Sequence, residues 1–246
     1  MKNRILSCRK LRLKTFAYLY KMENQPNHNI APAPWNLTGN AYIMVYKFSK
    51  DFVEEYGFLA DYQRDRFLGY VGTVMLVDYQ TSAVGPYREL LFIPGMFTFD
   101  WKKMFSISKI YVSSQDSVYN GIENWGIPKE FADFDWLQNA DGSEDISVKI
   151  EGQEFFKANF KKGFISFPLT TAIFPLNVVQ KLRKDLIITN PTARGKATLA
   201  NMKSVKIDKN FFPDLSKATP LLTMKVKDFE MTFNVPMIKR DYFVTT

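Results

Sequence analysis

The sequence predicts a mainly β domain with a few short helices, arranged as an antiparallel barrel or sandwich. Two observations lead to this prediction. The 246 residues include 22 Phe and 12 Tyr, and aromatic residues favour strands. Many short segments of strand-like composition follow one another at short spacing, and only a few short helices interrupt them. Because no internal repeat and no second domain are evident, we expect one large domain.

The folded domain is predicted to begin near Trp35, with a first strand over residues 41–48. A short helix over 49–56 follows, because Ser49 is a suitable N-cap and acidic residues occupy the first turns. Gly57 is expected to end this helix.

Eight further strands are predicted from their β-branched and aromatic content, at 69–79, 87–93, 105–112, 146–150, 154–160, 163–167, 195–206 and 221–233. Asp141-Gly142 indicates a turn. Gly152 and Lys162-Gly163 indicate two hairpin turns, so that the central strands form a meander.

The net charge of +8 comes from one end of the chain. Residues 1–21 contain seven Lys and Arg and no acid, which leaves 26 basic against 25 acidic residues in 22–246. A nucleic-acid-binding surface needs clustered surplus positive charge. We therefore expect no nucleic-acid partner for the domain. We also expect no membrane span, because no apolar run approaches about 20 residues.

Three interpretations of residues 1–21 remain open: a targeting peptide, a helix that binds a surface, or an extension upstream of a start at Met22. We favour the extension, because a secretory signal would need an uninterrupted apolar core. The predicted organisation is then a basic extension over 1–21, a proline-rich lead-in over 22–34 and a single domain over 35–246. A cytoplasmic location is expected, with organellar targeting by 1–21 left open.

Cysteine and histidine chemistry is excluded from the domain by composition. The single cysteine, Cys8, and the single histidine, His28, both precede Trp35. An intrachain disulfide, a zinc site and a Cys–His or Ser–His catalytic pair are therefore not expected. We predict no metal and no cofactor, and a titratable site must be built from Asp, Glu, Lys, Tyr or Arg.

The segment 117–130 is the most informative stretch of the chain. It predicts a short helix that ends at Gly126, followed by Pro128, which places Lys129 at the start of a strand. A lysine held in this way can act as a Schiff-base nucleophile. On the predicted strand 87–93, Glu89 is surrounded by apolar residues and needs a partner if it is buried. Glu89 and Lys129 could satisfy each other inside a barrel.

These segments resemble the acetoacetate decarboxylase family. The resemblance rests on Tyr87-Arg88-Glu89, Gly121-Ile122-Glu123 and Pro128-Lys129, with weaker similarity at Pro34-Trp35 and Asp228-Phe229. It covers residues 34 to about 235.

The resemblance implies a closed antiparallel β-barrel-like fold around an apolar pocket, assembled into a homo-oligomer. It implies that Lys129 is the iminium-forming lysine and Glu89 an active-site glutamate. Tyr87 and Trp125 are candidates for lining the pocket, although aromatic residues in so aromatic a chain are usually core. The implied partner is a small carbonyl compound.

The sequence departs from the family at several charged positions. Glu130 follows Lys129 where family decarboxylases have a second lysine, and a nearby carboxylate would raise the pKa of Lys129 above ~10.4. Successive strand residues face opposite ways, so that Glu130 could instead point away. Ile122 replaces an arginine, and approximate alignment puts Val74 and Gly39 where the family has a glutamate and an arginine. These departures argue against the namesake decarboxylation.

Two functions from different classes follow. The first is a Schiff-base-forming lyase of the decarboxylase, aldolase or dehydratase type that acts on a small oxo acid or ketone. The alternative is a non-enzymatic or inactive barrel that binds an apolar small molecule, with Lys129 in a structural ion pair with Glu89 or Glu130. The position of the Lys129 ammonium group discriminates between them. Binding of a membrane surface or RNA by residues 1–21 is a third hypothesis that concerns only that segment.

Overall fold

The computed structural model describes residues 28–173 and 176–244. One compact unit begins at Ala31, four residues before the first strand. The expectations for residues 1–21, including Cys8, lie outside the described residues. No helix in the described ranges is both long and apolar enough to span a membrane.

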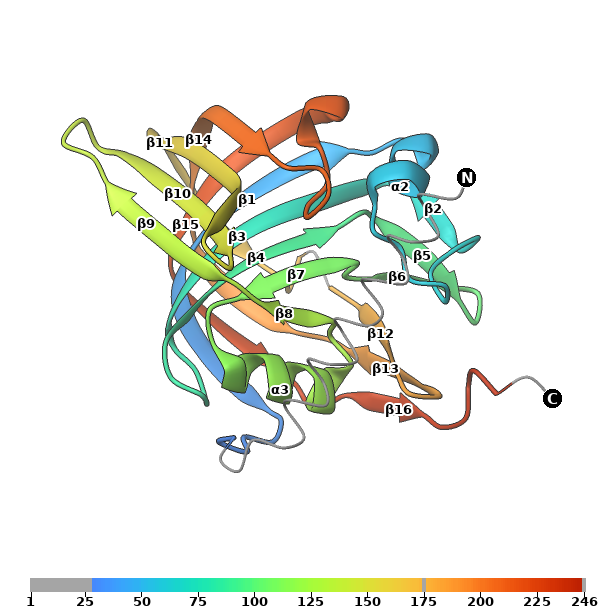
Figure 1. The fold of residues 1–246 in the computed structure, drawn as a ribbon. Helices are drawn as coiled ribbons and strands as arrows, with labels where there is room; N and C mark the ends of the chain where they lie inside the picture. The colour runs from blue at the N-terminus through green and yellow to red at the C-terminus, as the bar shows by residue number, and fades with distance from the viewer. Residues whose placement is uncertain (1–27, 174–175, 245–246) are drawn as a thin grey trace. The chain divides into compact units, whose positions relative to one another are not determined.

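The architecture is mainly β, as predicted, with a ten-stranded sheet that curves into a nearly closed, barrel-like form (Figure 1). In spatial order its strands are β8 (Lys129–Phe131), β7 (Lys109–Val112), β4 (Tyr87–Ile93), β3 (Val71–Thr81), β1 (Trp35–Lys47), β15 (Thr219–Phe233), β14 (Thr192–Ile207), β11 (Gln153–Thr170), β10 (Ser143–Ile150) and β9 (Asp133–Gln138). All neighbours in this sheet pair antiparallel except β7 and β8.

A second, six-stranded sheet has the order β16 (Met237–Lys239), β13 (Asp185–Thr189), β12 (Val178–Leu182), β6 (Lys102–Phe105), β5 (Met96–Phe99) and β2 (Phe67–Gly69). The strand predicted over 105–112 is wrong, because this stretch passes from one sheet to the other. At the crossing, the Ser106 hydroxyl donates to the Val179 carbonyl at 2.8 Å and accepts from Gln63 at 2.7 Å. These bonds hold the backbone between β6 and β7 in place of strand pairing.

The predicted hairpin turn at Lys162-Gly163 is also wrong. Strand β11 runs unbroken through this point, and a β-bulge between Lys162 and Ser166 takes up the extra residues. A Cβ at Gly163 would lie 2.9 Å from the Leu199 carbonyl oxygen, so the close approach of the two strands requires glycine. The glycine therefore marks a bulge and close packing rather than a chain reversal.

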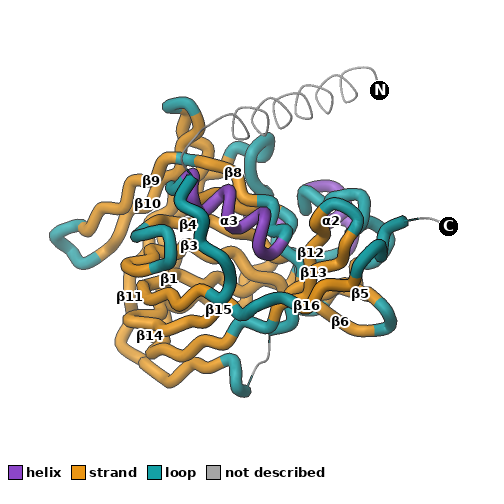
Figure 2. Tube along the Cα trace, turned by 90° about the horizontal axis from the view of Figure 1, so that it is seen from below, coloured by secondary structure: helices purple, strands orange, loops and turns teal. Residues whose placement is uncertain are grey.

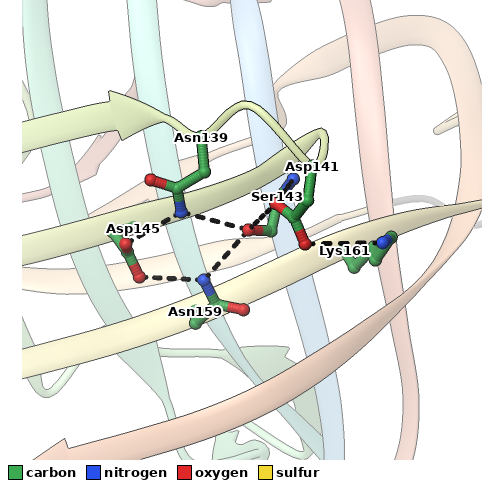
Figure 3. Close-up of polar contacts among 6 residues, drawn as sticks. All are labelled: Asn139, Asp141, Ser143, Asp145, Asn159 and Lys161. Atoms are coloured by element: carbon green, nitrogen blue, oxygen red, sulfur yellow. Dashed lines mark hydrogen bonds and ion pairs between the residues drawn. The ribbon is translucent and has the colours of Figure 1, made fainter.

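The predicted turns at Asp141-Gly142 and Gly152 are confirmed, because each connects neighbouring antiparallel strands. Figure 3 shows the polar network around the first turn. Asp141 accepts bonds from the Ser143 amide at 2.9 Å and hydroxyl at 2.6 Å, and these bonds lower the pKa of Asp141 to about 2. Asn139 and Asn159 donate to Asp145 at 2.9 and 2.8 Å, which ties the turn to β11.

Helix α2 (Lys50–Tyr56) confirms the predicted short helix. The Ser49 side chain accepts a bond from the Phe52 amide at 3.1 Å, as an N-cap does, and Gly57 follows the last turn. The other helical elements are α3 (Gln115–Trp125) and a 3₁₀ turn, η1 (Leu215–Lys217).

Two adjoining rows of residues cross β1, β3, β4 and β7, and both rows are buried although they face opposite sides of the sheet. One row enters the main hydrophobic core: Tyr42, Leu76, Leu90 and Tyr111. The next row faces away from that core: Ala41, Val77, Glu89 and Val112. The sheet is therefore covered on both sides at this level, and α3 covers the side that carries Glu89, as Figure 2 shows for its position beside β8.

Candidate active site

The candidate site is built on a β7-α3-β8 unit. Strands β7 and β8 are parallel, with Ile110 opposite Lys129, and α3 connects them. Parallel neighbours require such a crossover, since a tight hairpin can join only antiparallel strands. This unit adds one parallel pair to an otherwise antiparallel sheet, and it places α3 directly over the lysine.

The ends of α3 fix where β8 begins. The Ser114 hydroxyl accepts a bond from the Ser117 amide at 3.2 Å and caps the N-terminus. At the C-terminus, Gly126 adopts the left-handed conformation (φ 67°), and its amide bonds to the Ile122 carbonyl at 2.8 Å. The sequence prediction that Gly126 ends the helix and delivers Lys129 to a strand is confirmed.

The Lys129 ammonium group lies in a buried polar cluster. Its Nζ is 3.2 Å from Glu89 Oε2, and each side chain is only 5% exposed. Lys129 also donates to the Ser117 hydroxyl at 3.0 Å and to the Tyr87 hydroxyl at 3.4 Å. The cluster therefore brings together Lys129 of β8, Glu89 and Tyr87 of β4, and Ser117 of α3. The sequence predicted the meeting of Lys129 with Glu89.

Tyr79 extends the cluster on the far side of Glu89. Its hydroxyl donates to Glu89 Oε1 at 3.3 Å, and its ring packs 4.6 Å from that of Tyr87. Burial, reinforced by the Glu89 carboxylate, raises the pKa of both phenols above the ordinary value. Both tyrosines are therefore protonated near neutral pH; Tyr79 donates to Glu89, and the Tyr87 oxygen accepts from Lys129.

Opposing effects act on the pKa of Lys129. Burial lowers it, whereas Tyr87 and the Glu89 carboxylate raise it, and the net result is a pKa above the ordinary value. Tyr87 is uncharged near neutral pH, so the ion pair with Glu89 is what keeps the amine protonated. Removing the proton requires a transfer to Glu89 or loss of the pair.

Gly121 makes room for the lysine under α3. A Cβ at this position would lie 2.6 Å from Lys129 Cδ and 2.9 Å from Cε. Ser117 precedes Gly121 by one helical turn, so both face the lysine from the same side of the helix. The Ser117 hydroxyl bonds the ammonium group, and Gly121 leaves space for the methylene chain of the lysine.

Glu130 belongs to the opposite face of β8. It lies across from Tyr111 and contacts Lys109 Nζ at 2.5 Å, with its side chain 52% exposed. Lys109 is buried and sits over the rings of Phe58 and Tyr111, at 5.3 and 4.7 Å from their centroids. Two Lys–Glu pairs therefore occupy opposite faces of β7 and β8, and Glu130 does not contact Lys129.

Trp125 is buried at the end of α3, apart from the ammonium group. Its ring packs edge-on against Trp35 at 5.2 Å and Phe233 at 4.9 Å, and its indole N–H donates to the Asn234 carbonyl. These contacts place Trp125 in an aromatic layer under the helix. None of these contacts involves Lys129, so they do not support the prediction that Trp125 lines the pocket.

Packing explains why position 74 is Val, and backbone spacing explains why position 39 is Gly, the two positions aligned with charged residues of the family. Val74 is fully buried in the main core, on the face opposite Glu89. A Cβ at Gly39 would lie 2.2 Å from the Asp78 carbonyl oxygen, so this backbone admits no side chain there. Neither position provides a charge to the Lys129 cluster.

Sequence reasoning missed the roles of Ser117, Tyr79 and Lys109. The four-residue spacing of Ser117 and Gly121 was a usable signal, because it places both on one helical face. Tyr79 has no local signal, since it meets Glu89 only through the β3–β4 register. Within the described ranges, no group of three or more His, Cys, Asp or Glu side chains could hold a metal ion.

The region that carries the cluster matches a known family. Residues 68–166 match the family model described as acetoacetate decarboxylase. This stretch includes all the residues of the Lys129 cluster, Tyr79, Tyr87, Glu89, Ser117 and Lys129. The match agrees with the resemblance found in the sequence.

Solved structures agree with this fold. An acetoacetate decarboxylase from Legionella pneumophila is 14% identical with a TM-score of 0.66, covering 90% of this chain and 94% of the other. The enduracididine biosynthesis enzyme MppR in complex with pyruvate is 14% identical with a TM-score of 0.64, covering 87% and 93%. An acetoacetate decarboxylase-like enzyme from Sphingomonas wittichii RW1 is 9% identical with a TM-score of 0.62, covering 88% and 97%. No curated protein sequence gives a significant match.

Proposed function

We propose that this acetoacetate decarboxylase-like protein is a lyase that forms a Schiff base between Lys129 and a small oxo acid or ketone. The observation that supports this best is the position of the Lys129 ammonium group, buried 3.2 Å from Glu89 with Glu130 on the other face. An exposed pair between Lys129 and Glu130 would have argued against it. The reaction is of the decarboxylase, aldolase or dehydratase type.

Activation begins with a proton transfer from Lys129 to Glu89. Their 3.2 Å separation allows a direct transfer, and the product is a neutral amine beside a neutral carboxylic acid. A buried site favours such a neutral pair more than water does, because desolvation penalises both charges. The amine is then able to attack a carbonyl carbon.

Formation of the iminium uses the same proton. Attack of the amine breaks the carbonyl π bond and gives a carbinolamine, with the tyrosine and serine hydroxyls at 3.4 and 3.0 Å from Nζ placed to bond its oxygen. Glu89 returns its proton to that oxygen, which leaves as water with a second hydrogen from the nitrogen. The ammonium ion and the carbonyl compound thereby become an iminium and one water, with Glu89 again a carboxylate.

The iminium can then accept the electron pair of a breaking bond at the adjacent carbon, which is the step shared by decarboxylation, retro-aldol cleavage and dehydration. The related enzyme MppR has been solved with pyruvate, a small oxo acid. We propose the same substrate class here. Because the cluster holds no cation besides Lys129, a substrate carboxylate would have to be bound by hydroxyl groups, which favours ketones and monocarboxylic oxo acids over dicarboxylates.

The test is borohydride trapping with pyruvate, acetoacetate and acetone, followed by peptide mass analysis. We expect an adduct on Lys129, lost in Lys129→Met and retained in Lys109→Met. The two variants are matched, because each removes a buried lysine from a Lys–Glu pair on β7 or β8. No adduct on Lys129 in the folded wild-type protein with any of the three compounds would overturn the proposal.

The alternative is a non-enzymatic barrel in which Lys129 and Glu89 form a structural ion pair and an apolar small molecule is bound without reaction. A specific observation favours it: two cavities on β11, β14 and β15 are lined by residues outside the Lys129 cluster, so small molecules have space to bind away from the lysine. Ligand binding that is unchanged in Lys129→Ala, together with the absence of an adduct, would support this alternative.

A homo-oligomer is also part of the proposal. Two large apolar side chains are almost fully exposed, Trp101 at 98% on the turn between β5 and β6 and Phe164 at 100% in the bulge of β11. Exposed apolar groups of this size are typical of contact surfaces when they occur in patches. Light scattering on the wild type and on Phe164→Ser tests whether the bulge contributes to assembly.

A further inference from the structure

A cationic hollow lies on strands β11, β14 and β15. Its volume is about 390 Å³, and its lining consists of Lys162, Ser166, Lys196, Thr198, Lys227 and Asp228. Small-molecule sites commonly have volumes of about 300 to 1,000 Å³. The hollow shares no residue with the Lys129 cluster.

The lysines of this hollow are placed against one another by strand register. Lys196 on β14 lies directly opposite Lys227 on β15. Like charges directly opposite each other destabilise a sheet. Lys162 adds a third positive charge from β11, so the lining carries three cations against one carboxylate.

None of these three lysines forms an ion pair with a described residue, whereas basic residues around the hollow do. On β14, Arg194 pairs with Glu230 at 2.6 Å, and on β15 Lys225 pairs with Glu144. The hollow therefore gathers three lysines that have no ion-pair partner among the described residues. A bound anion would remove the repulsion between Lys196 and Lys227.

Two hydroxyl groups add hydrogen-bonding capacity. Ser166 and Thr198 lie opposite each other on β11 and β14, and their oxygens are 2.8 Å apart. One hydroxyl donates to the other, so the accepting hydroxyl keeps its hydrogen for a further acceptor. Thr198 is 5% exposed, which puts this donor pair at the base of the hollow.

Irregular backbone flanks the hollow on two strands. The β11–β14 register shifts between Lys162 and Ser166, and the β14–β15 register shifts between Arg194 and Lys196. Bulges redirect side chains and are frequent beside functional sites. Both shifts occur within two residues of lining lysines.

We propose that this hollow binds a phosphate-bearing small molecule. Lysine ammonium groups act as point charges that suit phosphate oxygens, whereas planar carboxylates are better matched by the arginine fork. No arginine lines this hollow, and Arg194 nearby is engaged with Glu230. The site is independent of Schiff-base chemistry, so its test does not depend on the proposed reaction.

Titration calorimetry with inorganic pyrophosphate tests the proposal. We expect Lys196→Gln/Lys227→Gln to weaken binding by about ten-fold or more, which corresponds to about 1.4 kcal/mol. The matched control is Lys203→Gln/Lys206→Gln, which removes two exposed lysines from the same strand, β14, outside the hollow. Equal weakening in both double variants would mean attraction to net charge alone and would overturn the proposal.

Thermal unfolding gives a second readout. Without ligand, Lys196→Gln/Lys227→Gln is expected to unfold at a higher temperature than wild type, because the like-charge pair is gone, and pyrophosphate should no longer raise that temperature. Should this double variant fail to fold, Lys162→Gln replaces it, with weakened binding as the expected result. Absence of pyrophosphate binding to the wild type, or citrate binding as tight as that of pyrophosphate, would overturn the assignment.

Discussion

Lys129 and Glu130 are adjacent in the chain, yet their side chains occupy opposite faces of β8 and bind different partners. Lys129 pairs with Glu89 beneath α3, and Glu130 pairs with Lys109 on the other side of the sheet. The sequence neighbour of the candidate nucleophile therefore does not set its electrostatics. The carboxylate that does so comes from β4.

Glu130→Gln should leave the reactivity of Lys129 unchanged. The β-strand lies between the two side chains, and the Glu130 carboxylate bonds only to Lys109 among the described residues. We expect the pH midpoint of borohydride trapping at Lys129 to match wild type. A clear downward shift of that midpoint would show that Glu130 acts through the strand.

Glu89→Gln should lower the pH at which Lys129 becomes reactive. In wild type, burial lowers the pKa of Lys129 but Tyr87 and the Glu89 carboxylate raise it further, so trapping should increase as pH rises toward a midpoint above the ordinary lysine value. Without the carboxylate, one of the two groups that raise the pKa of Lys129 is gone, and the midpoint falls below that of wild type. The maximal trapping rate should also fall, because the amide cannot accept or return the proton. An unchanged midpoint across a pH series would contradict the assigned ion pair.

Gly121→Ala should destabilise the protein although alanine is the better helix former. In an open helix this change stabilises by about 0.5 to 1 kcal/mol, but here the new Cβ would lie 2.6 Å from Lys129 Cδ. We expect a lower midpoint of urea unfolding and slower trapping. In a Lys129→Ala background the same change should become stabilising, since the methylenes it meets are gone.

Lys129→Met should lower the free energy of unfolding by about 3 to 5 kcal/mol, because it leaves Glu89 buried without its cation. Replacing both partners, as in Lys129→Met/Glu89→Leu, should recover much of this loss. Urea unfolding of the two single variants and the double variant forms the thermodynamic cycle. Additive losses would show that the two side chains are not coupled.

Asp141→Asn should remove one source of acid sensitivity. The Ser143 bonds depress the pKa of Asp141 to about 2, so the stability that this group contributes is present above the unfolded value of ~3.9 and is lost as pH falls toward 2. Unfolding measured at a series of pH values from 2 to 5 should show a shallower dependence in the variant. Identical slopes of unfolding free energy against pH in the two proteins would show that this turn does not contribute to acid sensitivity.

Local signals in the sequence predicted local structure correctly. Ser49 capped α2, Gly126 ended α3 with a left-handed residue, and Gly152 formed a turn, because each depends on backbone preferences of a few consecutive residues. The prediction failed at Gly163, because this glycine is required by the close approach of the distant Leu199 carbonyl and not by a turn in its own segment. It failed again over 105–112, because the chain leaves the six-stranded sheet at the end of β6 and enters the ten-stranded sheet at the start of β7.

The sequence by itself determined the mainly β class, the delivery of Lys129 to a strand and the candidacy of Glu89. Only the tertiary structure decided that these two side chains meet, that Tyr79 and Ser117 join them, and that Glu130 faces away. The physical reason is that strand register and the packing of α3 on the sheet are set by contacts between distant residues. The alternation of side chains along a single strand shows that neighbours face opposite ways, but not which face the helix covers.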